Sequence, residues 1–202
     1  VPLAMIGVEA WRNYQRSRAA PWVHAYKWPI LCFIAVGFWN VVGAGLLGFT
    51  LNTPIALYYM QGMNMTAAHG HAALFGVYGM LGIGLLLFCL RGLSNRAAWS
   101  DKLLGLMFWS LNIGLAMMVF MSLVPAGIHQ AWASISEGVW FARSPEFVHS
   151  LWMETYVWLR VPGDIVFAVG TLFLAVFAVR LLIVRRDPAA MASANALVGK
   201  TT

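Results

Sequence analysis

Charged side chains are scarce in this sequence. Only 10% of the 202 residues are Asp, Glu, Lys or Arg, whereas 61% are hydrophobic, and a soluble domain usually carries about 25% charged residues. This scarcity excludes an ordinary soluble fold. The high apolar content also excludes an intrinsically disordered chain, which requires low hydrophobicity and high charge. The composition is therefore typical of an integral membrane protein in a lipid bilayer.

Acidic residues and cysteines are also few. Seven Asp and Glu stand against thirteen Lys and Arg, which gives a net charge of +6. In a soluble protein this excess would favour a nucleic-acid partner, but basic residues of membrane proteins gather on cytoplasmic loops, so we expect no nucleic acid. Cys32 and Cys89 both lie in apolar runs, where a thiol behaves as a small hydrophobe. We therefore expect no disulfide framework.

Four apolar runs are long enough to cross a bilayer, which takes roughly 20 residues in a helix. The predicted spans cover about residues 29–51, 66–90, 102–124 and 161–184. They predict an all-α integral membrane protein whose four transmembrane helices, in one membrane domain over residues 1–202, belong to a larger bundle. Residues 1–11 resemble the end of an apolar helix that begins upstream, so we expect a longer polypeptide. Residues 187–202 are expected to form a loose tail.

The basic residues are distributed unevenly between the two ends of the predicted spans. If the chain zigzags through the membrane, eleven of the thirteen fall on one side, and only Arg143 and Arg160 fall on the other. The eleven-residue side, which includes the C-terminus, is predicted to be cytoplasmic. The outer connection over residues 125–160 is rich in Trp, and we expect it to form short helices along the membrane surface.

Two histidines lie near the outer end of the second span, in the sequence His69-Gly70-His71. A histidine inside a membrane is a candidate functional residue, because an unpartnered polar side chain is costly there. Positions i and i+2 of a helix point about 200° apart, so these two imidazoles face opposite sides. They cannot chelate one metal ion, and the i, i+4 spacing of helical zinc sites is absent.

Small residues surround this pair of histidines. They are Ala67, Ala68, Gly70, Ala72, Ala73 and Gly76. A helix with so little bulk lets a planar ring approach on either side, and a haem requires axial imidazoles and a flat apolar slot. Small residues equally let membrane helices pack together, with each histidine bonded to a carbonyl. Spacing and composition leave both interpretations open.

Other candidate chemistry is weaker. We expect His24, His129 and His149 to be interfacial, partly solvated side chains. No serine or cysteine lies in a recognisable arrangement with a histidine and a carboxylate, and the glycines of the second span favour close helix packing.

Arg160 and Asp164 lie near the start of the predicted fourth span. A proline between them at Pro162 favours a plain helix start, where an acidic residue in the first turn is also stabilising. The functional alternative is that Arg160 pairs with a haem propionate and that Asp164 accepts a proton or a hydrogen bond from a quinol. Both interpretations remain open from the sequence.

The sequence also resembles a known family. Residues 69–80, His-Gly-His-Ala-Ala-Leu-Phe-Gly-Val-Tyr-Gly-Met, resemble the tenth core helix of the haem-copper oxidase superfamily, and in particular its nitric oxide reductase branch. Residues 87–92, 131–133 and 159–164 are similar to the single-subunit, quinol-dependent type. The resemblance extends over nearly the whole chain and implies the C-terminal portion of the catalytic subunit.

This resemblance implies specific roles. His69 would be the catalytic residue, as the axial ligand of haem b3, and His71 would be an axial ligand of haem b. A quinol site near Asp164 is implied as well. The implied activity is respiratory reduction of two NO to N2O and water in a bacterial cytoplasmic membrane. Gly70 departs from the bulky aromatic that many oxidases carry between the two histidines.

The family also requires ligands that this chain lacks. Its non-haem iron takes an adjacent histidine pair, and no such pair occurs here; the second ligand of haem b is missing too. We therefore expect the N-terminal part of the same polypeptide as a partner, alongside lipid, quinol and NO, with a homodimer left open. The alternatives are a non-catalytic haem b electron-transfer subunit, another haem-copper-type terminal oxidase, and a helical transporter or scaffold without haem.

Overall fold

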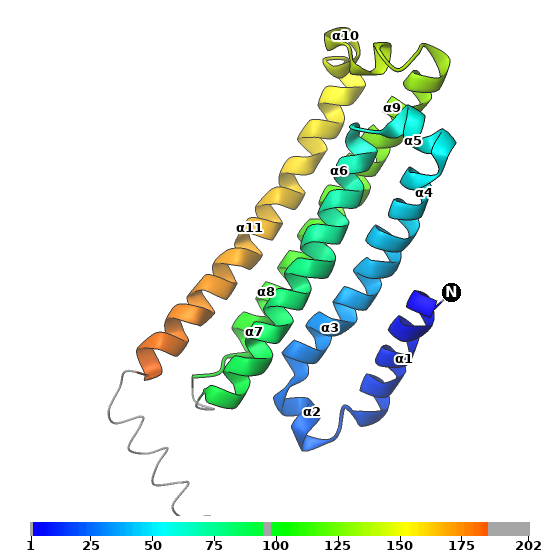
Figure 1. Ribbon diagram of the computed structural model, residues 1–202. Coiled ribbons are helices and arrows are strands. Elements are labelled where there is room, and N and C mark those ends of the chain that lie inside the picture. Colours follow the sequence, from blue (N-terminus) through cyan, green and yellow to red (C-terminus); the bar gives the residue numbers. More distant parts are fainter. Residues whose placement is uncertain (1, 95–97, 186–202) are drawn as a thin grey trace, which may run out of the picture.

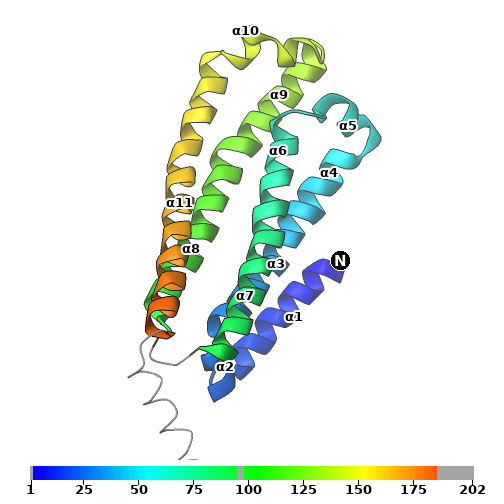
Figure 2. The same cartoon turned by 60° about the vertical axis from the view of Figure 1, so that its left-hand side comes forward.

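The computed structural model describes residues 2–94 and 98–185, so the expected tail over residues 187–202 lies outside the described residues. Within the described ranges every regular element is a helix. Four helices are long and apolar enough to cross a membrane, namely Lys27–Asn52, Asn64–Leu93, Asp101–Ser136 and Leu151–Ile183. They stand side by side as a bundle (Figures 1 and 2), which confirms the predicted all-α membrane fold.

Several spans are built from more than one helical segment. In the first half of the chain the elements are α1 (Pro2–Ser17), α2 (Pro21–Ala25), α3 (Lys27–Trp39), the π-helix η1 (Asn40–Leu47), α4 (Gly48–Asn52), α5 (Pro54–Met60), α6 (Asn64–His71), the π-helix η2 (Ala72–Gly79) and α7 (Met80–Leu93). In the second half they are α8 (Asp101–Met117), the π-helix η3 (Met118–Leu123), α9 (Val124–Ser136), the 3-10 helix η4 (Phe141–Arg143), α10 (Pro145–Val148) and α11 (Leu151–Arg185). We call the two ends of the bundle the α2 end and the α10 end.

The helices at the α10 end are longer than the sequence predicted. The third span does not stop at Pro125 but continues through α9 to Ser136, and α11 begins at Leu151. The connection is therefore residues 137–150 rather than 125–160, and it holds the short helices η4 and α10. A membrane helix can continue through a proline when a local π-type adjustment satisfies the backbone groups that the proline leaves unbonded. The π-helix η3 directly precedes Val124 and Pro125, so it explains why the helix continues here. At the other end, α1 reaches Ser17 and thus exceeds the predicted residues 1–11.

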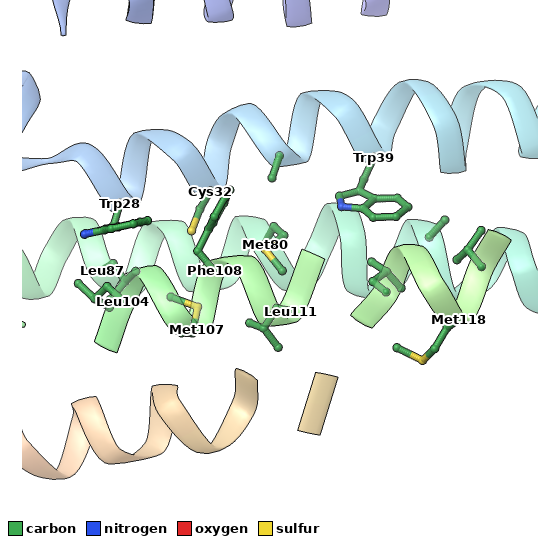
Figure 3. Packing of buried hydrophobic residues seen from close by; sticks show 14 of the residues in the cluster. Trp28, Cys32, Trp39, Met80, Leu87, Leu104, Met107, Phe108, Leu111 and Met118 are labelled. Carbon is green, nitrogen blue, oxygen red and sulfur yellow. The ribbon is translucent and has the colours of Figure 1, made fainter. Parts of the chain in front are cut away.

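The core of the bundle lies between α3, α7 and α8 (Figure 3). Trp28 and Trp39 on the first span are both buried there, and each finds a polar partner on α8. The Nε1 of Trp28 donates to Asp101 at 2.8 Å, and the Nε1 of Trp39 donates to Asn112 at 2.9 Å. Because each buried indole N–H is satisfied, the two bonds fix the first span against the third without an orphaned donor.

Candidate functional site

The helix that carries the two histidines is anchored at its start. The buried Gln130 of α9 accepts two hydrogen bonds through Oε1, from the backbone N–H of Asn64 at 2.9 Å and from its side-chain amide at 2.7 Å. Gly127 lets the same helix approach closely, because a Cβ there would lie 2.7 Å from the backbone nitrogen of Met65. The register of α6 is therefore set by α9.

His69 faces the first span. Its Nδ1 lies 2.8 Å from the carbonyl oxygen of Gly43 in η1, and its ring lies 3.0 Å from the position that a Cβ of Gly48 would occupy. This contact depends on very close packing of η1 on η2, since a Cβ on Gly43 would lie 2.6 Å from the Cβ of Ala72. The carbonyl oxygen that accepts from His69 therefore lies within reach because position 43 is a glycine, which lets η1 pack directly on η2.

His71 faces the other way, toward the fourth span. Its Nδ1 lies 2.8 Å from the carbonyl oxygen of Ala67, one turn back in α6, and its Nε2 lies 3.1 Å from Nη2 of Arg160 in α11. The two imidazoles therefore contact different neighbours on opposite sides of one helix, as the i, i+2 spacing indicated.

The hydrogen bonds fix the tautomer of both rings. A carbonyl oxygen only accepts, so Nδ1 of each histidine must donate its hydrogen. In the neutral imidazole, Nε2 then carries the lone pair. A histidine whose Nδ1–H is held by a carbonyl and whose Nε2 is left as an acceptor has the arrangement that metal-ligating histidines adopt. Within the described residues, no hydrogen bond engages Nε2 of His69.

Arg160 and Asp164 do not form a helix start. Because α11 begins at Leu151, Pro162 lies inside the helix and that interpretation of the sequence is wrong. Instead the two side chains pair with each other at 3.2 Å across one turn, both partly exposed. They share the side of α11 that faces His71, so the structure brings three of the four predicted site residues together.

A cavity of about 620 Å³ opens between α6, η2, η3 and α11. Its polar end holds Arg160 and Asp164, and the remainder is mostly apolar. The lining residues are His71, Phe75, Met118, Arg160, Asp164, Phe167, Ala168, Thr171, Leu172 and Ala175. Only His71, Arg160 and Asp164 could be singled out as site residues from the sequence, because Met118 and the residues from Phe167 onward belong to no motif.

These residues fit a haem. The cavity offers an imidazole nitrogen, apolar walls with small residues at Ala168 and Ala175, and a guanidinium at one end for a propionate. Ligation by His71 and its hydrogen bond to Arg160 exclude each other, because both use the lone pair of Nε2. The Arg160 side chain is 36% exposed, so it has freedom to move toward a carboxylate instead. His69 also suits a haem ligand, because the bond from its Nδ1 to the Gly43 carbonyl orients the ring and leaves Nε2 to bind iron.

The other histidines lie apart from this site. His24 is exposed at the α2 end, and His149, also exposed, lies 3.9 Å from Glu154 near α10. His129 is partly buried against Phe147 and Tyr156, at ring distances of 5.3 and 6.1 Å. Within residues 2–94 and 98–185, no group of three or more His, Cys, Asp or Glu side chains gathers as a metal site.

Comparison with known proteins places these residues in context. The sequence pattern of the family described as "Cytochrome C and Quinol oxidase polypeptide I" matches residues 6–166, a range that contains both histidines, Arg160 and Asp164. The chain is also 29% identical over 134 residues to a nitric oxide reductase subunit of Stutzerimonas stutzeri. That alignment covers 64% of this chain but only 28% of the relative, so the chain spans a minor part of that protein's length.

The family is one of membrane-integral, haem-binding oxidoreductases, and its helical bundle agrees with the four spans described above. Since the matched range includes more than half of the residues, the chain belongs to the cytochrome c and quinol oxidase polypeptide I family, within the haem-copper oxidase superfamily.

Proposed function

We propose that this chain supplies the haem ligands of one helix to a respiratory nitric oxide reductase. The observation that carries the proposal is the pair His69 and His71, each with Nδ1 bonded to a carbonyl oxygen and each facing a different span. Two such imidazoles suit two separate haems that flank one helix. The relative named as a nitric oxide reductase subunit supports NO over other substrates of the superfamily.

In this proposal His69 is the axial ligand of haem b3 and His71 is one axial ligand of haem b. Bound haem and non-haem iron supply the redox chemistry by which two NO, two electrons and two protons give N2O and water. The non-haem iron ligands and the second ligand of haem b belong to the N-terminal part of the same polypeptide. The protein's own contribution is to orient the ligands and to exclude water.

The residues of the cavity have distinct proposed tasks. The apolar side chains Phe75 and Phe167, whose ring centroids lie 5.5 Å apart, keep the slot dry. Arg160 exchanges its hydrogen bond to His71 for one to a propionate. Asp164 accepts a proton or a hydrogen bond from a quinol that donates the electrons. Arg160 holds this carboxylate in place through the 3.2 Å pair.

The proposed setting is the bacterial cytoplasmic membrane, with the basic α2 end and the C-terminus on the cytoplasmic side. Partners besides the N-terminal part of the polypeptide are the lipid bilayer, a quinol and NO. A homodimer is compatible with this arrangement.

Replacement of each histidine tests the proposal. His71→Ala should remove the low-spin haem signal from the optical spectrum and keep the high-spin signal. His69→Ala should do the reverse and abolish turnover of NO. His149→Ala is the matched control, since that exposed residue lies outside the site, and its spectrum should not change. The assignment would be contradicted if either single replacement removed both haems, or if it removed neither haem.

A terminal oxidase that reduces O2 is the second candidate, because the family description names oxidases. Consumption of NO and of O2 by the purified protein separates the two candidates: a reductase of the proposed kind consumes NO far faster. A non-catalytic haem b subunit would have only six-coordinate haem and would not respond to CO, whereas an open haem position binds it.

A further inference from the structure

Two adjoining cavities lie at the α2 end of the bundle, at the other end from the histidine site. One, of about 430 Å³, is lined by Arg18, Ala19, Pro21, His24, Ala25 and Arg91. The other, of about 350 Å³, is lined by Tyr14, Arg18, Ala19, Val23, His24 and Lys27. Because they share Arg18, Ala19 and His24, we treat them as one feature and call it the basic cavity. Its lining residues come from the end of α1, from the short helix α2 and from the ends of α3 and α7, which lie at the same end of the bundle (Figure 1).

Three cationic side chains line the basic cavity. Arg91 is held in place from two sides: its Nε donates to the carbonyl oxygen of Ala25 at 2.9 Å, and its guanidinium carbon lies 4.9 Å from the centre of the Trp99 ring. Its two terminal nitrogens make no hydrogen bond to any described residue. Lys27 lies over Trp28, at 4.7 Å from the ring centre. Arg18 is exposed in the turn that follows α1.

No carboxylate among the described residues neutralises these cations. The ion pairs found among the described residues, His149 with Glu154 and Arg160 with Asp164, involve α11 and lie outside the basic cavity. Asp101, which starts α8, accepts a hydrogen bond from Trp28 and lines neither cavity. A concave site with several preoriented donors and no acid attracts an anion, and a fixed guanidinium suits the oxygens of a phosphate.

The position of the basic cavity indicates where that anion comes from. Lys27 is the first residue of a membrane span, so the cavity lies level with the membrane surface. The neighbouring Trp22 is 64% exposed, and exposed Trp side chains favour the headgroup region. Basic recesses between transmembrane helices at this depth bind lipid headgroups. We propose that the basic cavity binds the phosphate group of an anionic phospholipid.

In the proposed complex, Arg18 and Arg91 donate to the phosphate oxygens, and the Tyr14 hydroxyl and Lys27 contribute from the second cavity. The acyl chains then follow the apolar surface of the bundle. The bound lipid joins α1, α2 and α7, although α7 is far from the other two in the sequence. This function is independent of the haem site and does not require the proposed NO chemistry.

Lipid retention tests this proposal. The protein is purified from membranes in detergent, incubated with mixed micelles of phosphatidylglycerol or phosphatidylcholine, and washed, and the retained lipid is counted by mass spectrometry. We expect phosphatidylglycerol to be retained in preference to phosphatidylcholine. Arg18→Gln should weaken its binding about fivefold, and Arg18→Gln with Arg91→Gln about 25-fold, since each basic side chain near a membrane surface contributes about a factor of five.

Arg16→Gln is the matched control, because it removes the same charge only two positions from Arg18 but does not line the basic cavity. It should leave retention unchanged. Arg91→Lys keeps the charge but loses the bond to Ala25 and the planar guanidinium, so it should retain less lipid than the unaltered protein and more than Arg18→Gln with Arg91→Gln. Equal retention of both lipids, or equal loss in Arg16→Gln and Arg18→Gln, would overturn the proposal. Displacement of the lipid by low millimolar inorganic phosphate would also overturn it and indicate a soluble anion.

Discussion

At the scale of single residues, the hydrogen bond at Nδ1 of each histidine says as much about its role as its position in the sequence does. The i, i+2 spacing alone leaves open whether His69 and His71 are ligands or merely hydrogen-bonded side chains. The carbonyl oxygens of Gly43 and Ala67 each engage Nδ1. A carbonyl at Nδ1 leaves Nε2 with its lone pair, so these hydrogen bonds are compatible with ligation and prepare the ring for it.

Asp164 offers a prediction at this scale. Asp164→Asn removes a proton acceptor but keeps a side chain that can bond to Arg160, so the fold should be unaffected. Turnover with quinol should fall about 100-fold, in the range of losses for a general base. Turnover with an artificial donor that reduces the haem directly should persist. The check is the ratio of the two rates in purified protein.

Glu154→Gln is the control for that experiment, because Glu154 is also an exposed carboxylate on α11 but does not line the cavity. Its turnover with quinol should be normal. Normal quinol turnover in Asp164→Asn would remove Asp164 from the proposed quinol site.

At the scale of elements, three π-helical segments lie around the histidine helix. η1 provides the carbonyl of Gly43, η2 follows His71 directly, and η3 places Met118 in the cavity. Such segments occur often at functional sites, because the altered hydrogen-bond pairing rotates the side chains that follow. The sequence offered no sign of them, since π-helical pairing depends on what the neighbouring spans demand.

Close packing of η1 on η2 gives a second prediction. Gly43→Ala would bring a methyl group to 2.6 Å from the Cβ of Ala72, which forces the two segments apart and moves the carbonyl away from His69. We expect a loss of about 1–3 kcal/mol in stability, as for other overpacked sites. Thermal unfolding in detergent should show a lower midpoint.

Gly82→Ala serves as the comparison, since nothing lies within 4 Å of its added Cβ and alanine favours a helix. Its unfolding midpoint should match or slightly exceed that of the unaltered protein. Equal midpoints for the two variants would show that the approach of η1 to η2 is less tight than described.

At the scale of the whole molecule, charge is concentrated at one end of an apolar bundle. The α2 end includes the ends of α1 and α7, with most of the described basic residues, whereas the α10 end exposes Trp132, Trp140 and Trp152. This polarity predicts how the protein sits in its membrane.

Cysteine labelling measures that orientation. The background carries Cys32→Ala and Cys89→Ala. In cells with a permeabilised outer membrane and an intact cytoplasmic membrane, Glu137→Cys at the α10 end should react with a membrane-impermeant maleimide. Ser17→Cys at the α2 end should react only after the cytoplasmic membrane is broken. The opposite pattern would contradict the predicted orientation.

Much of this architecture follows from the sequence alone. Runs of about 20 apolar residues fix four spans, because a bilayer satisfies no backbone polar group and so requires helices. The spacing of His69 and His71 fixes their opposite directions, because each residue of an α-helix is rotated about 100° from the one before it. The boundaries of the third and fourth spans could not be predicted. Pro125 indicated that the third helix stops and Pro162 indicated that the fourth begins, but packing in the bundle keeps both prolines inside longer helices.

Only the tertiary structure decided what each imidazole meets. Gly43 is 26 positions from His69 and Arg160 is 89 positions from His71, and no local pattern marks these residues or Met118 as neighbours of the histidines. They come together because glycines allow η1 to lie against η2 and because α11 packs along α8 and η3. Local sequence thus determines helices and the directions of their side chains, whereas contacts between spans depend on shape complementarity that no single segment encodes.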